Sequence, residues 1–146
     1  MSAFANALVN RIIDAVLRGQ PLQLQSRYFV GLHTVQASSQ FAGTEVSAGG
    51  YTRVAISSSM DNWSGTQAPA SNTVSTGSTA GSTNNIPIVF PAAAADWGTI
   101  VGFGLYPVAT GGAPEIYGSV VTPTPVFAGS LSTAFKAGDL LIQFDS

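Results

Sequence analysis

The sequence predicts a mainly β protein, an antiparallel β-sandwich of about seven to eight strands preceded by one N-terminal amphipathic α-helix. Near the start of the chain, apolar residues recur every three or four positions, which is typical of a helix with one apolar face. After Pro21, short runs of β-branched and aromatic residues are separated by Gly, Pro and Asn, which is typical of antiparallel strands. The 146 residues suit a single folded unit, which we divide into a helix, 1–19, and a β-sandwich domain, 20–146.

The predicted helix opens the chain. Its apolar positions are Phe4, Leu8, Val9, Ile12, Ile13, Val16 and Leu17. We expect Ser2 to cap its first turn, Gly19 to end it in the left-handed conformation and Pro21 to prevent its continuation. Two roles stay open for this helix: it docks on its own domain, or it inserts into a partner. Because the segment starts without positive charge and is interrupted by Asn10 and Arg11, we expect neither a signal peptide nor a membrane anchor.

Seven later segments are predicted strands, because they are rich in β-branched and aromatic residues and are flanked by turn residues. They are 28–33, 51–57, 86–90, 99–106, 115–121, 125–128 and 139–144. Two adjacent glycines predict a hairpin loop at 109–113, and Gly129 and Gly138 predict further turns. Residues 64–85, rich in Ser, Thr, Gly and Asn, predict a long loop that is either mobile at the surface or ordered as an arm against a neighbouring subunit.

Charged residues are scarce in most of the chain. Across the 74 residues from Asn62 to Phe135, only Asp96 and Glu115 are charged. Catalysis usually depends on ionisable groups close to the reacting bonds, so we predict that the protein is not an enzyme. Hydroxyls and small apolar groups can pack against other subunits without the cost of desolvating charge, which indicates a structural part of an assembly.

Composition also limits the expected partners and cofactors. A net charge of −2 provides no basic face for phosphates, so we expect no nucleic-acid partner, and the polar interruptions of the first helix argue against a membrane partner. The chain has no cysteine, and His33 is its only histidine. We therefore predict no cofactor and no metal site, although calcium bound by loop carboxylates alone stays open.

Two catalytic arrangements have some basis in the sequence. A serine and His33 could form a hydrolytic triad with Asp14, Asp61 or Asp96, but the Gly-x-Ser-x-Gly pattern of a nucleophile elbow is absent. Asp96 and Glu115 are the best carboxylate pair for a glycosidase, yet each lies beside turn residues without an aromatic cleft. We favour a structural role over both.

Nine residues are candidates for contacts between subunits. They are Phe4, Leu8, Ile12, Val16, Glu45, Tyr51, Arg53, Trp63 and Trp97. Tyr51 and Arg53 would lie on one face of a strand, and Glu45 is the nearest carboxylate that could pair with Arg53. We expect Trp97 to fill one end of the sandwich while its indole N–H finds a hydrogen-bond partner.

Several short motifs follow one another along the chain. They are YFVGL at 28–32, GTEVSAGGYTR at 43–53, IVFP at 88–91 leading to DWGTIV at 96–101, and GFGLY at 102–106 followed by GG at 111–112. With these motifs, and with a first helix that ends in Arg18-Gly19, the chain resembles a family of small tailed-bacteriophage virion proteins, usually labelled tail fibre or minor tail proteins. Tyr106-Pro107 and a longer loop after Trp63 depart from the family pattern. The resemblance implies a structural role in a virion and brings no catalytic residues.

We therefore predict a non-enzymatic structural component of a tailed-bacteriophage virion, placed at the tail, tail fibre or baseplate, that assembles through subunit interfaces. It would be made in the host cytoplasm and bind other virion proteins and copies of itself, as a trimer by analogy with tail fibres and capsid decorations. Two alternatives stay open: a capsid decoration protein, and a receptor- or sugar-binding module at a fibre tip with a host receptor as partner. In the second, Trp63, Trp97, Tyr106 and Tyr117 would be exposed and would stack on sugar rings.

Overall fold

The computed structural model describes residues 2–144, and these form a mainly β fold with one helix near the N-terminus, as the sequence predicts. The helix, α1, spans Asn6–Arg18. The strands are β1 (Ser2–Phe4), β2 (Arg27–Val35), β3 (Thr44–Glu45), β4 (Val54–Ser57), β5 (Gly81–Thr83), β6 (Ile88–Val89), β7 (Gly98–Tyr106), β8 (Ile116–Val126), β9 (Ala134–Phe135) and β10 (Leu141–Gln143).

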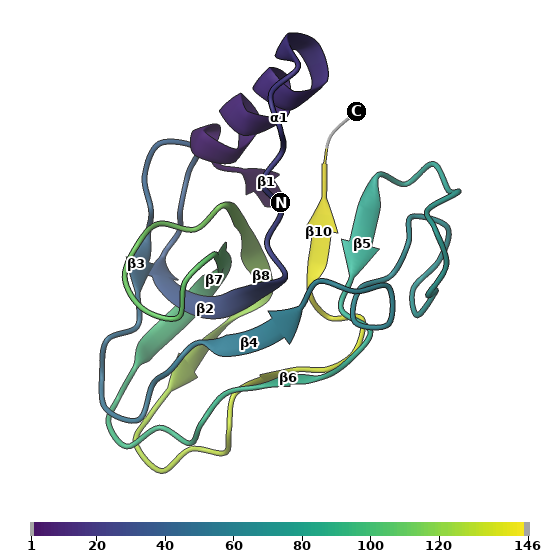
Figure 1. Cartoon of the computed structure of the whole chain (residues 1–146). Coiled ribbons are helices and arrows are strands. Elements are labelled where there is room, and N and C mark those ends of the chain that lie inside the picture. The colour runs from purple at the N-terminus through teal and green to yellow at the C-terminus, as the bar shows by residue number, and fades with distance from the viewer. Residues whose placement is uncertain (1, 145–146) are drawn as a thin grey trace.

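Six of these strands form one antiparallel sheet that curls on itself (Figure 1). Its order is β1-β8-β7-β2-β3, and β4 also pairs with β2. Residues 27–30 of β2 pair with β4 and residues 33–35 pair with β3, so two short strands share one edge of β2. The predicted hairpin loop joins β7 to β8, and its Gly111 and Gly112 have positive φ angles of 70° and 67°.

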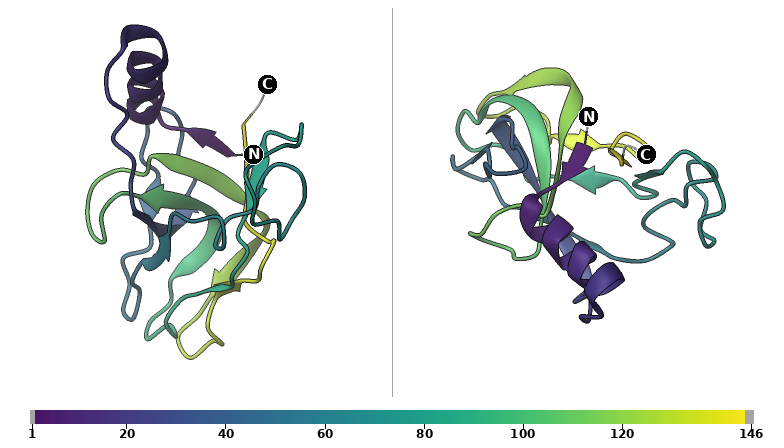
Figure 2. Two further views of the ribbon diagram at one scale, coloured as in Figure 1. Left: turned by 45° about the vertical axis from the view of Figure 1, so that its right-hand side comes forward. Right: turned by 90° about the horizontal axis from the view of Figure 1, so that it is seen from above.

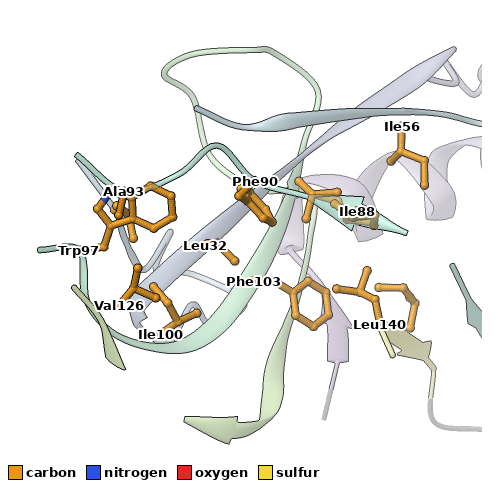
Figure 3. Close-up of a cluster of buried hydrophobic side chains, with 14 residues drawn as sticks. Leu32, Ile56, Ile88, Phe90, Ala93, Trp97, Ile100, Phe103, Val126 and Leu140 are labelled. Atoms are coloured by element: carbon orange, nitrogen blue, oxygen red, sulfur yellow. The ribbon is translucent and has the colours of Figure 1, made fainter. Parts of the chain in front are cut away.

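The core is a single cluster of buried apolar side chains inside the curled sheet. It consists of Val30, Leu32, Val46, Ile56, Ile88, Phe90, Ala93, Trp97, Ile100, Phe103, Leu105, Val126, Leu140 and Ile142. Figure 3 shows Leu32 and Phe103, from the central strands β2 and β7, next to Phe90, which follows β6, and Leu140, which precedes β10. The two-stranded sheets β6–β9 and β5–β10 contribute to the same core, an arrangement compatible with the predicted sandwich.

The helix projects from one end of the curled sheet (Figures 1 and 2), and its start differs from the prediction. Ser2 is not the N-cap: its backbone belongs to β1, where it pairs with Gly118, and the N-cap is Ala5, which makes no side-chain cap. Residues 2–4 pair with the edge of β8 through backbone hydrogen bonds. The helix therefore begins only after this short strand. At the other end the prediction is confirmed, since Gly19 has a φ of 68° and donates its N–H to the Asp14 carbonyl.

The strand predictions are right for the long central strands and wrong at several boundaries. Segments 115–121 and 125–128 both overlap a single strand, β8, which continues through a change of register between them. Segment 51–57 is a strand only from Val54, since Gly50, with a φ of 83°, forms a turn just before it. The sequence does not predict β1, β3, β5 or β9, because two or three residues are too few to show an alternating pattern.

Residues 64–85 form a loop for most of their length, but the last few form β5, and Asn84 bridges to Trp63. Hydrogen bonds within the loop hold it in shape. The Gln67 side-chain amide donates to Thr73 Oγ1 at 2.9 Å, and the Gly77 N–H donates to Thr66 Oγ1 at 3.0 Å. In this structure the loop therefore orders against itself.

Candidate functional site

A buried group of polar side chains lies around Glu45, and we call Glu45, Tyr51, Arg53, Tyr106 and His33 the Glu45 cluster. Glu45 lies in β3 and Arg53 directly precedes β4, the two strands that share one edge of β2. The Arg53 guanidinium clamps the carboxylate with two hydrogen bonds of 2.7 Å, from Nε to Oε1 and from Nη2 to Oε2. The predicted pairing of these residues is confirmed. Because the Arg53 side chain is 4% exposed, loss of the carboxylate would leave a buried charge without a counter-ion.

Tyr51 joins this ion pair to the core. Its hydroxyl donates to Glu45 Oε1 at 2.6 Å and accepts a hydrogen bond from the Leu32 N–H at 2.9 Å. Its ring meets Trp97 edge to face, with centroids 5.4 Å apart, and the Trp97 indole donates to the Gly49 carbonyl at 3.0 Å. Burial and the hydrogen bond to Glu45 raise the pKa of Tyr51 far above its usual value, so the phenol stays protonated and keeps donating.

Tyr106 forms the other side of the Glu45 cluster. Arg53 Cζ lies 3.4 Å from the centroid of the Tyr106 ring, and the Tyr106 hydroxyl lies 2.7 Å from His33 Nε2. Gly31 and Gly104 pair across β2 and β7, and a Cβ on either would come within about 3.0 Å of the ring. The ring can lie there only because both residues lack a side chain. Burial lowers the pKa of His33 to about 4 and raises the pKa of Tyr106 to about 12, so both are neutral near pH 7.

The groups considered for a hydrolytic triad lie in different surroundings, and Asp61 is exposed in a turn after β4. His33 is fully buried against Tyr106, whereas Asp14 pairs with Arg18 on the helix surface. Asp96 accepts a hydrogen bond from the Ala128 N–H at 2.9 Å. The structure therefore does not assemble the hydrolytic triad that the sequence left open.

A second polar group fixes the base of α1 to the sheet, and we call Arg11, Tyr28 and Glu115 the helix tether. Arg11 Nη2 forms an ion pair with Glu115 Oε1, and the Tyr28 hydroxyl donates to Glu115 Oε2 at 2.8 Å. The Ala5 N–H adds a hydrogen bond of 2.8 Å to the Glu115 carbonyl. Burial, followed by the contact with Glu115, raises the pKa of Tyr28.

The sequence analysis missed the helix tether, because Arg11 and Glu115 lie 104 residues apart. One signal was available: Glu115 is one of only two charges between residues 62 and 135, and the helix carries two of the four arginines. Asp96 and Glu115 lie at opposite ends of the β7–β8 pair, so these two carboxylates do not form the glycosidase pair considered above.

The apolar face of α1 is covered only at its base. Leu8 is the one buried residue of the helix, and Ile12 is half-buried. Val16 and Leu17 are 73% and 77% exposed, and Ile13 is also exposed. The predicted amphipathic helix is therefore confirmed, and the half of its apolar face nearer the C-terminal end faces solvent.

The other predicted interface residues lie in two places. Phe4 is in β1, where its ring contacts Phe144 with centroids 3.8 Å apart, and it lines a small apolar groove of about 260 Å³ together with half-buried Trp63. Trp97 is buried, and so is Tyr106, so neither ring is exposed as the alternative of a sugar-binding tip requires. Trp97 packs edge to face on Tyr51, and the Tyr106 ring lies under the Arg53 guanidinium.

The described residues, 2–144, bear on metal binding and on membranes in two ways. They contain no group of three His, Cys, Asp or Glu side chains placed to hold a metal ion. Their helix is too short to cross a membrane.

Comparison with known families gives the class of the protein. A family model matches residues 3–143, which is nearly the whole chain, and it describes fibre proteins of podophages. The family is the one described as "Podophage GP4 fiber I protein gp80", and the chain belongs to it. The resemblance to phage tail fibre proteins is thereby confirmed, and the protein is a structural component of a virion. No curated protein matches the chain.

Proposed function

We propose that the protein is a non-enzymatic part of a podophage tail fibre that assembles with other virion proteins and with copies of itself, using α1 as its anchor. The observation that carries this proposal is the exposed apolar face of the helix, where Val16 and Leu17 are about three-quarters exposed. Exposed apolar side chains gathered on one helix face mark a contact site, because water leaves such a surface when a partner covers it.

The base of the helix supports an anchoring role. The helix tether and the hydrogen bond from the Asn6 N–H to the Ser39 carbonyl, 3.1 Å long, hold the first turn on the domain. The helix therefore stands in a defined direction before any partner binds. A contact surface that is already ordered loses less conformational entropy on assembly.

The proposal of a non-enzymatic role is supported by the contacts of the ionisable side chains. His33 is buried and neutral, Glu115 is held by Arg11 and Tyr28, and Asp96 binds a backbone N–H. A general acid or base must instead reach a substrate. The fibre family favours the fibre over capsid decoration, and the buried rings of Trp97 and Tyr106 weigh against a sugar-binding tip. Synthesis in the host cytoplasm and a trimeric state remain part of this proposal.

A matched pair of substitutions in the phage tests the anchor. Val16 and Val74 are both 73% exposed, but Val74 lies in the polar loop away from α1. We expect Val16→Asp to lower the amount of the protein in purified particles about tenfold or more, as for an interface anchor, and Val74→Asp to leave it unchanged. The amount is measured by quantitative mass spectrometry. Unchanged incorporation of Val16→Asp would show that the helix face is not the anchor.

A further inference from the structure

A groove lined in part by apolar side chains lies on the side of the curled sheet. The groove has a volume of about 740 Å³ and lies between the second half of β8 and residues 130–135. Its floor reaches the core residues Ile100, Phe103 and Leu140, and its rim carries Val121 and Leu131, which are both 95% exposed. Such a volume is within the range of protein binding pockets, and several aliphatic side chains can enter it.

The groove exists because β8 leaves the sheet register. Ile100 pairs with Thr124 and Gly102 pairs with Ser119, so four residues of β8, 120–123, stand opposite one residue of β7. Among the described residues, β1 covers only residues 116–118 of β8, and the rest of that edge has no strand beside it. The bulge and the bare edge together open the side of the sheet.

The chemistry of this edge favours a helix over an added strand. Pro123 and Pro125 have no backbone N–H, so a strand laid along the edge would lack hydrogen bonds at two positions. A helix needs no main-chain partner and inserts side chains spaced at i, i+3 and i+4. Ile13, Val16 and Leu17 have this spacing and are exposed.

The helix cannot occupy the groove of its own chain. The helix tether fixes its base at the end of β8 that begins with Ile116, whereas the groove is lined by residues 119–126. From that base α1 projects away from the rest of the sheet (Figures 1 and 2). A copy of α1 that fills this groove must therefore belong to another molecule.

Charge makes a second copy a suitable occupant. Helix α1 contains two arginines and one aspartate, a net charge of +1, whereas residues 28–146 contain two basic and six acidic residues, a net charge of −4. In the groove the one charged lining residue is Asp139. On the helix Arg18 directly follows the exposed Leu17, and its ion pair with Asp14 is exposed, so Arg18 is accessible to an acidic partner. Opposite charges on the two surfaces favour their approach and orient the contact.

We propose that α1 of one copy inserts Ile13, Val16 and Leu17 into the groove between β8 and residues 130–135 of a second copy. The proposal rests on the proposed function above and names the partner of the anchor helix. Since the helix and the groove lie toward opposite ends of β8, the contact joins unlike surfaces head to tail. Contacts of this kind close into a ring or continue as a filament, and either is compatible with a fibre.

Cross-linking tests the pairing directly, because the chain has no native cysteine. Purified Leu17→Cys and Leu131→Cys proteins are mixed and treated with a short bis-maleimide reagent. We expect a mixed dimer, and we expect much less product from either variant alone. The matched control is Val74→Cys mixed with Leu131→Cys. Cross-linking of Leu17→Cys only to itself would assign the helix to a helix–helix contact and overturn the proposal, as would a mixed yield no higher than that of the control.

Self-association provides an independent readout. We expect Leu131→Asp to weaken association about tenfold or more in sedimentation equilibrium, and Val74→Asp to leave it unchanged. Because Leu131 is 95% exposed, circular dichroism and thermal unfolding should show an intact fold. A monomeric wild-type protein at high concentration would overturn the head-to-tail contact and the self-assembly part of the proposed function, but not the anchor role of α1. Exclusion of Val16→Asp from particles, seen together with that monomer, would leave the anchor role standing with a different partner.

Discussion

The Glu45 cluster and α1 differ in how far their side chains are covered from solvent. The cluster buries charge and satisfies it within the chain: the Glu45 carboxylate accepts from Arg53 twice and from Tyr51 once. The helix leaves apolar side chains in water, with Val16 and Leu17 about three-quarters exposed. The first region satisfies its charges within the chain, whereas the second gains stability only when a partner covers it.

This difference separates the parts of the chain that hold the fold from the part that makes contacts. Substitutions in the Glu45 cluster should reduce stability, and substitutions on the exposed helix face should reduce assembly with little effect on stability. The helix tether lies between these extremes, since the Arg11 side chain is 32% exposed and that of Glu115 is 12% exposed. The following predictions test the order of these effects.

The largest effect is expected for Glu45→Gln. Arg53 would keep its charge in a site where its side chain is 4% exposed, and loss of a buried partner costs about 3 to 5 kcal/mol of unfolding free energy. Urea denaturation followed by tryptophan fluorescence measures the change. Asp14→Asn is the control, because its ion pair with Arg18 is exposed and is expected to contribute less than about 0.5 kcal/mol.

A double variant sharpens this prediction. In Glu45→Leu with Arg53→Met, both charges are gone, so most of the stability lost in Glu45→Gln should return. A double variant that loses as much as the single one would mean that the geometry of the pair, and not the stranded charge, stabilises the edge of β2.

The next effect is a loss of stability in acid that depends on His33. The pKa of this histidine is lowered from its unfolded value of about 6.5 to about 4, so the unfolded chain binds the proton more readily between these values. Stability should therefore be full above pH 6.5 and should fall by about 3 kcal/mol as the pH drops to 4. The charged groups that act on His33 are Glu45, which raises its pKa, and Arg53, which lowers it.

Comparison with His33→Phe isolates this contribution. The variant loses the contact with the Tyr106 hydroxyl at every pH, but its stability should change less between pH 6.5 and 4 than that of the wild type. Urea midpoints at four pH values give both slopes. Equal slopes in the two proteins would show that other groups cause the acid sensitivity.

The sequence predicted the local parts of this picture and missed the parts that join distant segments. Glu45 and Arg53 lie eight residues apart, and the scarcity of charge left few other partners, so their pairing could be predicted. The amphipathic helix and its end at Gly19 followed from periodicity and from the conformational freedom of glycine. Arg11 and Glu115 could not be paired in this way, because nothing local to either residue indicates the strand order that brings them together.

The misplaced start of the helix has the same cause. Whether Ser2 caps a helix or extends a sheet depends on the free edge of β8, which begins more than 110 residues later in the chain. The groove could not be predicted from the sequence either. It lies at the change of register in β8, where two predicted strands form one. Exposure of Val16 and burial of Trp97 likewise depend on which surfaces the fold brings together.

A smaller effect is expected for Glu115→Gln, which weakens the helix tether. Arg11 would lose its ion pair, but partial exposure lets water solvate the guanidinium, so the cost should be about 1 to 2 kcal/mol. Amide hydrogen exchange should speed up in α1 while β2 and β7 keep their protection. Arg18→Gln, which removes an exposed ion pair, is the control. Exchange that stays slow in α1 would show that Leu8 and the backbone bonds at Ala5 and Asn6 suffice to hold the helix.

The smallest effect on stability is expected for Leu17→Gln. Gln and Leu have similar helix propensities, and a side chain that is 77% exposed loses little burial on substitution, so the unfolding free energy should change by less than about 0.5 kcal/mol. Leu8→Ala on the same helix is the contrast, because Leu8 is 8% exposed and its truncation should cost about 2 to 3 kcal/mol. Thermal unfolding of both variants measures the difference. Similar losses in the two would mean that Leu17 is already covered in the isolated protein, and the exposed face of α1 would then need no partner.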